Sequence, residues 1–170
     1  MDNLVLNYMA AVYVFLFGAC IGSFLNVCIY RIPAGESIVS PPSSCPRCGH
    51  RIRLYDNIPI LGWLLLRGRC RDCSARISIR YPIVELATAL LALLTFYKFG
   101  LAVPALLTFA FGASLLVISL IDLDHYIIPN TITLPGIPAC MLASLVMPEM
   151  TWKASLAGIL AGGGSLYAVA

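Results

Sequence analysis

Long stretches without a charged side chain constrain this sequence more than any other feature. Residues 3–30 carry no charge, and residues 101–121 carry none either. About 20 mostly apolar residues in a helix are enough to cross the hydrocarbon core of a bilayer. Of the 170 residues, 60% are hydrophobic and only 11% are charged, against about 25% charged residues in soluble domains. We therefore expect an all-α polytopic membrane protein, which excludes a disordered chain and a secreted disulfide scaffold.

The apolar stretches predict about five transmembrane helices in this chain. They cover residues 3–30, 82–97, 101–121, 132–147 and 154–170. We accordingly divide the chain into three parts. Residues 1–30 form a first transmembrane helix, residues 31–81 a polar insert, and residues 82–170 a helical membrane domain that we expect to be incomplete at its C-terminus.

Small residues within the apolar stretches predict how the helices pack. The spacing of Gly18 and Gly22, and that of Gly158 and Gly162, allows two helix backbones to approach closely. We expect this packing within the bundle rather than in a dimer. Cys20, Cys28 and Cys140 also lie in apolar stretches. We expect these three cysteines to be small buried side chains.

Basic residues are concentrated in the insert. Residues 31–80 contain nine arginines and three acidic residues, a balance of +6, whereas the rest of the chain has a balance of −3. Loops rich in Lys and Arg beside transmembrane helices stay on the cytoplasmic side. The insert is therefore predicted to be cytoplasmic, and counting spans places the polar connection after residue 121 on the same face.

Four cysteines of the insert form two Cys-x-x-Cys pairs. Cys45 and Cys48 are followed, 21 residues later, by Cys70 and Cys73. Two such pairs are typical of a tetrahedral zinc site, and four thiolates leave no open position for a substrate. We predict a structural zinc, which would stabilise an insert too small to bury much core of its own. The alternative is four spare thiols or a redox pair.

Asp122 directly follows an uncharged stretch of 21 residues. Ionisable groups at membrane depth are costly and are often functional. The alternative is an interfacial carboxylate that only ends the span. In a continuing helix Asp124 would face away from Asp122, whereas His125 would lie within its reach. Glu85 lies at a similar depth on the same side and is a possible structural partner.

Three sequence blocks, in order, resemble one family. They are Gly22–Pro33, the Cys-x-x-Cys insert continuing to Arg80–Glu85, and Ile121–Asn130. Together they are similar to the bacterial type IV prepilin peptidases, which are bifunctional leader peptidases and N-methyltransferases. The resemblance covers nearly the whole chain.

The resemblance implies an intramembrane aspartic peptidase of the GxGD type. Such enzymes cut the basic leader from type IV prepilins or type II secretion pseudopilins after a Gly, at the cytoplasmic face of the bacterial inner membrane. They then methylate the new N-terminus with S-adenosylmethionine. Asp122, seven residues before Pro129, matches the first catalytic aspartate. The cysteines at 45, 48, 70 and 73 match the cytoplasmic zinc domain, and no residue is identified for S-adenosylmethionine.

One departure from the family pattern concerns the second catalytic aspartate. In the family it lies in a Gly-x-Gly-Asp motif, which this sequence does not contain. We therefore expect a truncated chain that lacks peptidase activity on its own. The alternative is a peptidase-inactive protein that is only a methyltransferase or an accessory zinc-binding membrane protein.

A further alternative is a membrane-anchored zinc module that binds nucleic acid through its arginines. The insert lacks a series of aromatic residues for base stacking, so we expect no nucleic-acid partner. The expected partners are prepilin or pseudopilin substrates and membrane lipid.

Overall fold

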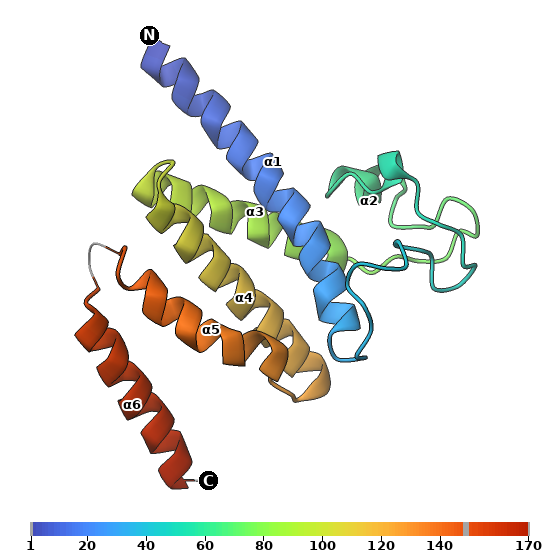
Figure 1. Cartoon of the computed structure of the whole chain (residues 1–170). Helices are drawn as coiled ribbons and strands as arrows, with labels where there is room; N and C mark the ends of the chain where they lie inside the picture. Colours follow the sequence, from blue (N-terminus) through green and yellow to red (C-terminus); the bar gives the residue numbers. More distant parts are fainter. Residues whose placement is uncertain (1, 148–149, 170) are drawn as a thin grey trace.

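The computed structural model describes residues 2–147 and 150–169, which form helices joined by short turns and one long insert (Figure 1). Residues 1, 148–149 and 170 of the predicted segments lie outside the described residues. The long helices are α1 (Asp2–Arg31), α3 (Arg80–Phe99), α4 (Val103–His125), α5 (Asn130–Ala143) and α6 (Trp152–Val169). The insert between α1 and α3 holds the short 3₁₀ turn η1 (Leu54–Asp56) and α2 (Leu61–Leu65). The all-α prediction is confirmed, since the described residues contain two isolated antiparallel bridges and no extended strand.

Three of the described helices are long and apolar enough to cross a membrane, where about five had been expected. They are α1 from Leu4 onward, α3 and α4. The predicted fourth span ends early, at Ala143 rather than Met147, so α5 has only 14 residues. At 1.5 Å per residue it is about 21 Å long, short of the roughly 30 Å hydrocarbon core. Ser144 follows α5, and its hydroxyl donates to the Met141 carbonyl at 2.6 Å, as expected of a side chain that competes with helical hydrogen bonding.

Helices α1 and α3 pack against each other through two glycines. A Cβ atom added at Gly18 would lie 2.7 Å from the Ala92 Cβ, and one added at Gly22 would lie 2.7 Å from the Glu85 Cα. Neither position has room for a larger residue. The predicted close packing at Gly18 and Gly22 is thus confirmed, and it occurs within the bundle. At Gly158 and Gly162 it is not found among the described residues, because an added Cβ would meet nothing within 4 Å.

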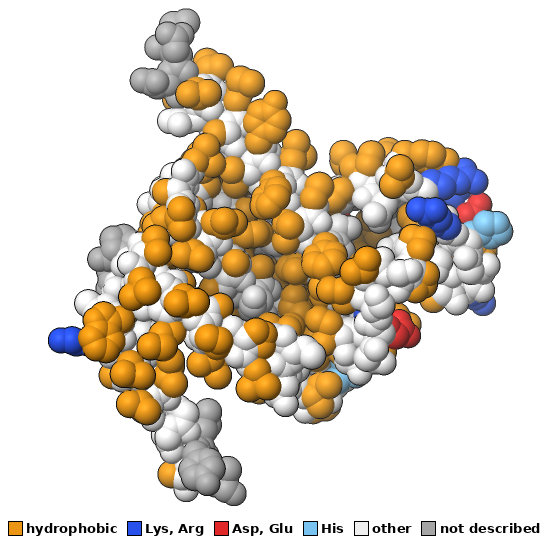
Figure 2. Space-filling model, viewed as in Figure 1, with side chains coloured by type: hydrophobic (Ala, Val, Ile, Leu, Met, Phe, Trp, Pro, Cys, Tyr) orange, Lys and Arg blue, Asp and Glu red, His pale blue; other side chains and the backbone are white. Residues whose placement is uncertain are grey.

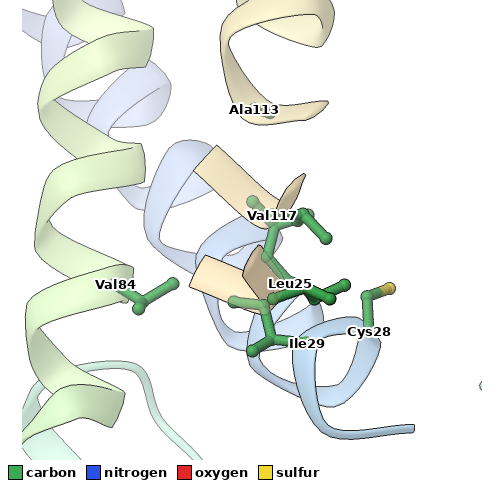
Figure 3. Close-up of a cluster of buried hydrophobic side chains, with 7 residues drawn as sticks. Leu25, Cys28, Ile29, Val84, Ala113 and Val117 are labelled. Atoms are coloured by element: carbon green, nitrogen blue, oxygen red, sulfur yellow. The ribbon is translucent and has the colours of Figure 1, made fainter. Parts of the chain in front are cut away.

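The core lies where α1, α3 and α4 meet (Figure 3). Thr88 is fully buried in this region of α3, and its hydroxyl donates to the Val84 carbonyl at 2.8 Å. A buried hydroxyl is therefore satisfied without a partner on another helix. The buried cluster consists of Leu25, Cys28, Ile29, Val84, Ala113, Val117 and Ile121.

Apolar side chains cover most of the outer surface of the helices, whereas most of the basic side chains on the face in view lie on the insert (Figure 2). This distribution explains why the burial expected for three cysteines was wrong for two of them. Cys28 is buried as expected, but Cys20 and Cys140 are exposed. An apolar stretch in a membrane protein faces lipid as well as protein, so it does not by itself bury a side chain in the core.

The glycine contact yields a stability prediction. Gly22→Ala adds a methyl group against the α3 backbone and should lower the free energy of unfolding by about 1–3 kcal/mol. Gly158→Ala is the matched control, because nothing lies within 4 Å of its added Cβ. That control should leave stability unchanged or raise it by up to about 1 kcal/mol. Unfolding of both variants in detergent, followed by circular dichroism, checks this, and equal stability of the two would contradict the packing.

Candidate functional site

The two Cys-x-x-Cys pairs form two turns of the same shape. In the first, the Cys45 N–H donates to the His50 carbonyl at 2.9 Å, and the Gly49 N–H donates back to the Cys45 carbonyl at 2.9 Å. In the second, the Cys70 N–H donates to the Ala75 carbonyl at 2.8 Å, and the Ser74 N–H donates to the Cys70 carbonyl at 2.9 Å. Gly49 and Ser74 both have positive φ, 72° and 57°. Each turn therefore directs two sulfur atoms to the same side.

The two turns bring all four cysteines together. Their sulfur atoms lie within 4.8 Å of one another, and the Cys45 and Cys73 sulfurs are 3.8 Å apart. A tetrahedral metal with metal–sulfur bonds of about 2.3 Å places its sulfur ligands about 3.8 Å apart. The cluster can therefore hold a metal ion. The backbone N–H groups of Cys48 and Arg47 lower the pKa of the Cys45 thiol to about 6, which favours its thiolate form. Desolvation and the neighbouring sulfurs raise the pKa of the Cys48 thiol, because one ionised sulfur disfavours a second beside it.

The matching turns expose a short internal repeat that sequence analysis missed. Both turns follow the pattern Cys-x-x-Cys-x-x-Arg-Ile, once ending at Ile52 and once at Ile77. In both, an antiparallel bridge closes the turn, between Ser44 and Arg51 in the first and between Arg69 and Arg76 in the second. The repeated Arg-Ile after each pair was the signal that could have revealed it.

Ion pairs join the second turn to the segment before α2. The Arg71 guanidinium donates to both carboxylate oxygens of Asp56, at 2.8 and 2.6 Å. These hydrogen bonds hold the pKa of Asp56 below its ordinary value. Arg53 lies 3.5 Å from Asp72. Two of the insert's three acidic residues are therefore engaged by arginine.

A carboxylate of α3 fixes the insert against the membrane helices. The Ile60 N–H donates to Glu85 Oε2 at 2.6 Å, and the Glu85 side chain is buried. Ile60 has a φ of 62°, which is rare for a β-branched residue. On α1, the Asn26 side chain donates to the Tyr81 carbonyl at 3.1 Å. The structural role considered for Glu85 is thus supported, although its partner is the insert backbone.

Asp122 lies in the last turn of α4 and is exposed. The helix ends at Tyr126, whose N–H donates to the Asp122 carbonyl at 2.8 Å from a left-handed conformation. Asp124 makes an ion pair with Arg80, and Arg80 also donates to the Leu120 carbonyl at 3.1 Å. The first turn of α3 and the last turn of α4 therefore lie side by side.

Asp124 and His125 were considered as partners of the Asp122 carboxylate, and the described structure pairs neither of them with it. Because α4 continues through His125, Asp122 and Asp124 lie about 200° apart around the helix, as expected. Within residues 2–147 and 150–169, neither His125 nor any basic side chain makes an ion pair with Asp122. Its carboxylate is thus available, and its catalytic role stays a prediction.

A large cavity separates the insert from the membrane helices. Its volume is about 1230 Å³. One wall is the C-terminal third of α1 with the start of α3, and the other wall is the insert, including Cys45 and Cys70. Figure 2 shows the insert as a lobe beside the bundle. Asp122 is not among the lining residues, so the cavity and Asp122 are separate features.

Comparison with known proteins places this arrangement in a class. Residues 16–99 match the model of the bacterial peptidase A24 N-terminal domain, and residues 109–170 match that of the type IV leader peptidase family. The first match takes in the four-cysteine insert with most of α1 and all of α3, and the second takes in most of α4 with α5 and α6. The chain belongs to the type IV leader peptidase family.

Several relatives carry the name prepilin leader peptidase/N-methyltransferase. The protein of Myxococcus xanthus (strain DK1622) is 47% identical over 156 residues, covering 89% of this chain and 45% of that protein. Those of Pseudomonas putida and Dichelobacter nodosus are 37% and 34% identical, covering 89% and 92% of this chain and 60% and 64% of those proteins. The chain thus spans about half to two thirds of these relatives' length. No solved structure matches the chain.

The cysteine cluster yields a metal prediction. The purified chain should contain about one metal ion, because four thiolates converge on one point. Cys70→Ser should release the ion and lower the melting temperature of the insert, whereas Cys140→Ser, outside the cluster, should do neither. Elemental analysis with thermal unfolding measures both. A wild-type chain that is folded but free of metal would contradict this.

Proposed function

We propose that this chain provides one catalytic carboxylate and the metal-binding insert of a prepilin leader peptidase and N-methyltransferase. Its substrates would be type IV prepilins or type II secretion pseudopilins, cut after a Gly at the cytoplasmic face of the bacterial inner membrane. The observation that carries the proposal is Asp122, an exposed carboxylate at the end of a membrane-spanning helix, engaged in no ion pair within the described residues.

The sidedness of Asp122 supports this proposal. The insert leaves α1 at Arg31 and enters α3 at Arg80. Arg80 also pairs with Asp124 at the end of α4, so Asp122 lies on the same side of the bundle as the insert. Because Arg-rich loops remain in the cytoplasm, we assign both features to the cytoplasmic face.

An aspartic mechanism needs two carboxylates that share one proton. The ionised one takes a proton from a water molecule, which attacks the carbonyl carbon of the scissile peptide, while the protonated one donates to the carbonyl oxygen. We assign one of these roles to Asp122. The other acids nearby are engaged, Asp124 by Arg80 and Glu85 by the Ile60 N–H. The second carboxylate is expected from a Gly-x-Gly-Asp segment, which this sequence does not contain.

The metal of the insert is proposed to be a structural zinc. Four thiolates and tetrahedral spacing suit zinc, and they leave no position for water or substrate. Zinc would hold the two turns together and take no part in peptide cleavage. Cys45, Cys48, Cys70 and Cys73 would be its ligands.

For the methyltransferase activity we propose S-adenosylmethionine as the methyl donor. When bound, it supplies a methyl group on a positively charged sulfur, which the new N-terminal amine of the pilin can attack. The lining of the cavity beside the insert does not select this donor. Its arginines that make no ion pair would repel the positively charged sulfur, although they could bind the carboxylate. We assign no residue to donor binding.

The peptidase assignment predicts the effect of removing Asp122. In a polypeptide that also supplies the second carboxylate, Asp122→Ala should reduce prepilin cleavage at least about a hundredfold, because a catalytic acid or base contributes that much or more. Glu36→Ala is the matched control, an exposed acid of the insert outside the cavity. Cleavage is read as the mobility shift of prepilin in a strain lacking its own peptidase. Wild-type processing by Asp122→Ala would overturn the assignment.

The two activities should separate in the same variant. Asp122→Ala is expected to methylate an already cleaved pilin as well as the wild type does, because the role proposed for Asp122 is proton transfer during cleavage of the scissile peptide, which a cleaved pilin no longer contains. Transfer of a radiolabelled methyl group to purified mature pilin measures this. Loss of methylation together with cleavage would show that Asp122 serves both reactions or that the variant is misfolded, and metal content distinguishes these outcomes.

A further inference from the structure

Two arginines lie directly opposite each other on the second cysteine turn. Arg69 and Arg76 form an antiparallel bridge, flanked by hydrogen bonds from Cys70 N–H to the Ala75 carbonyl and from Ile77 N–H to the Gly68 carbonyl, both 2.8 Å. This pattern defines a non-hydrogen-bonded pair, whose side chains leave the same face about 4.5–5.5 Å apart at Cβ. Like charges in this position repel each other.

The equivalent positions on the first turn are Ser44 and Arg51. The same hydrogen-bond pattern flanks them, with Cys45 N–H donating to the His50 carbonyl and Ile52 N–H to the Ser43 carbonyl, both 2.9 Å. Ser44, Arg51, Arg69 and Arg76 all line the same cavity. The four bridge positions of the two turns therefore offer three guanidinium groups and a hydroxyl, and none carries an acid.

The cavity contains an excess of unpaired positive charge. Seven arginines and three acidic residues line it. Each of these acids is already engaged: Asp56 by Arg71, Asp72 by Arg53, and Glu85 by the Ile60 N–H. Within the described part of the chain, five lining arginines make no ion pair. Arg31 donates instead to the Ser37 and Pro41 carbonyls, and the other four are Arg47, Arg51, Arg69 and Arg76. A cavity with this charge selects an anion.

The opposite wall shows what kind of anion fits. It is formed by the last turns of α1, a membrane-spanning helix, including Phe24, Val27 and Tyr30. Phe24 and Tyr30 are 46% and 66% exposed, so their rings are open to a ligand. A small soluble anion would gain nothing from this apolar wall. An amphiphile can place its charged group on the arginines and its chain along α1.

We propose that this cavity binds an anionic phospholipid. Its phosphate would lie between Arg69 and Arg76, with Arg51 and Ser44 as further donors, and its acyl chains would run along α1 toward the membrane. Guanidinium groups bind phosphate oxygens in paired, charge-assisted hydrogen bonds. The phosphate would also remove the repulsion between the two opposed arginines, so the lipid would stabilise the insert.

The test measures lipid binding to the full chain in detergent, for two lipids and for variants of the insert. Binding of phosphatidylglycerol is expected to be at least about tenfold tighter than binding of phosphatidylcholine of the same chain length, as measured by native mass spectrometry. The double variant Arg69→Gln with Arg76→Gln should lose this preference. Arg67→Gln is the matched control, because Arg67 is exposed in the same insert but does not line the cavity. Metal content confirms that each variant is folded.

Several outcomes would overturn the proposal. Equal binding of the two lipids by the wild type would do so, and this result does not depend on the folding of any variant. If Arg67→Gln weakened the preference for phosphatidylglycerol equally, the preference would come from the general positive charge of the insert and not from this site. Displacement of phosphatidylglycerol by millimolar inorganic phosphate would assign the arginines to a free anion. Because binding is measured without substrate, the result is independent of the proposed peptidase activity.

Discussion

The close contact between α1 and α3 is the constraint on which the rest of this structure depends. Gly18 and Gly22 let the two backbones meet, and this contact brings Arg31 and Arg80, the two ends of the insert, to the same end of the bundle. The residue that Gly22 faces is Glu85, whose carboxylate accepts the Ile60 N–H. The helix contact therefore also positions the insert, through one buried side chain.

The insert has little apolar core of its own and is organised by polar groups instead. Its described residues contain only five helical residues and a single 3₁₀ turn, so backbone order comes from the two cysteine turns, the bidentate Asp56–Arg71 pair and the Glu85 contact. A bound metal ion would stabilise such an arrangement, because four thiolates held this close would repel one another once ionised. Gly62 also allows the insert to pack closely, since any Cβ at this position would collide with the Asp56 carbonyl.

Much of this could be predicted from the sequence, and the failures have physical causes. Long apolar stretches predict α1, α3 and α4, because a helix that crosses the hydrocarbon core needs about 20 mostly apolar residues. Cysteine spacing predicts the cluster, because each pair is local in sequence. The contacts of Glu85 with Ile60 and of Arg80 with Asp124 join residues 25 and 44 positions apart, so no local pattern reveals them. The early end of α5 was missed because hydropathy does not report where a helix stops.

Arg80 connects the insert, which carries the cysteine cluster, to the end of α4, which carries Asp122. It is the first residue of α3, immediately after the insert, and it holds both Asp124 and the Leu120 carbonyl at the end of α4. Asp122 lies between these two contacts in the same helical turn. Arg80 thus joins the end of the insert to the helical turn that carries Asp122, even though the cysteine cluster and the cavity are built from other residues.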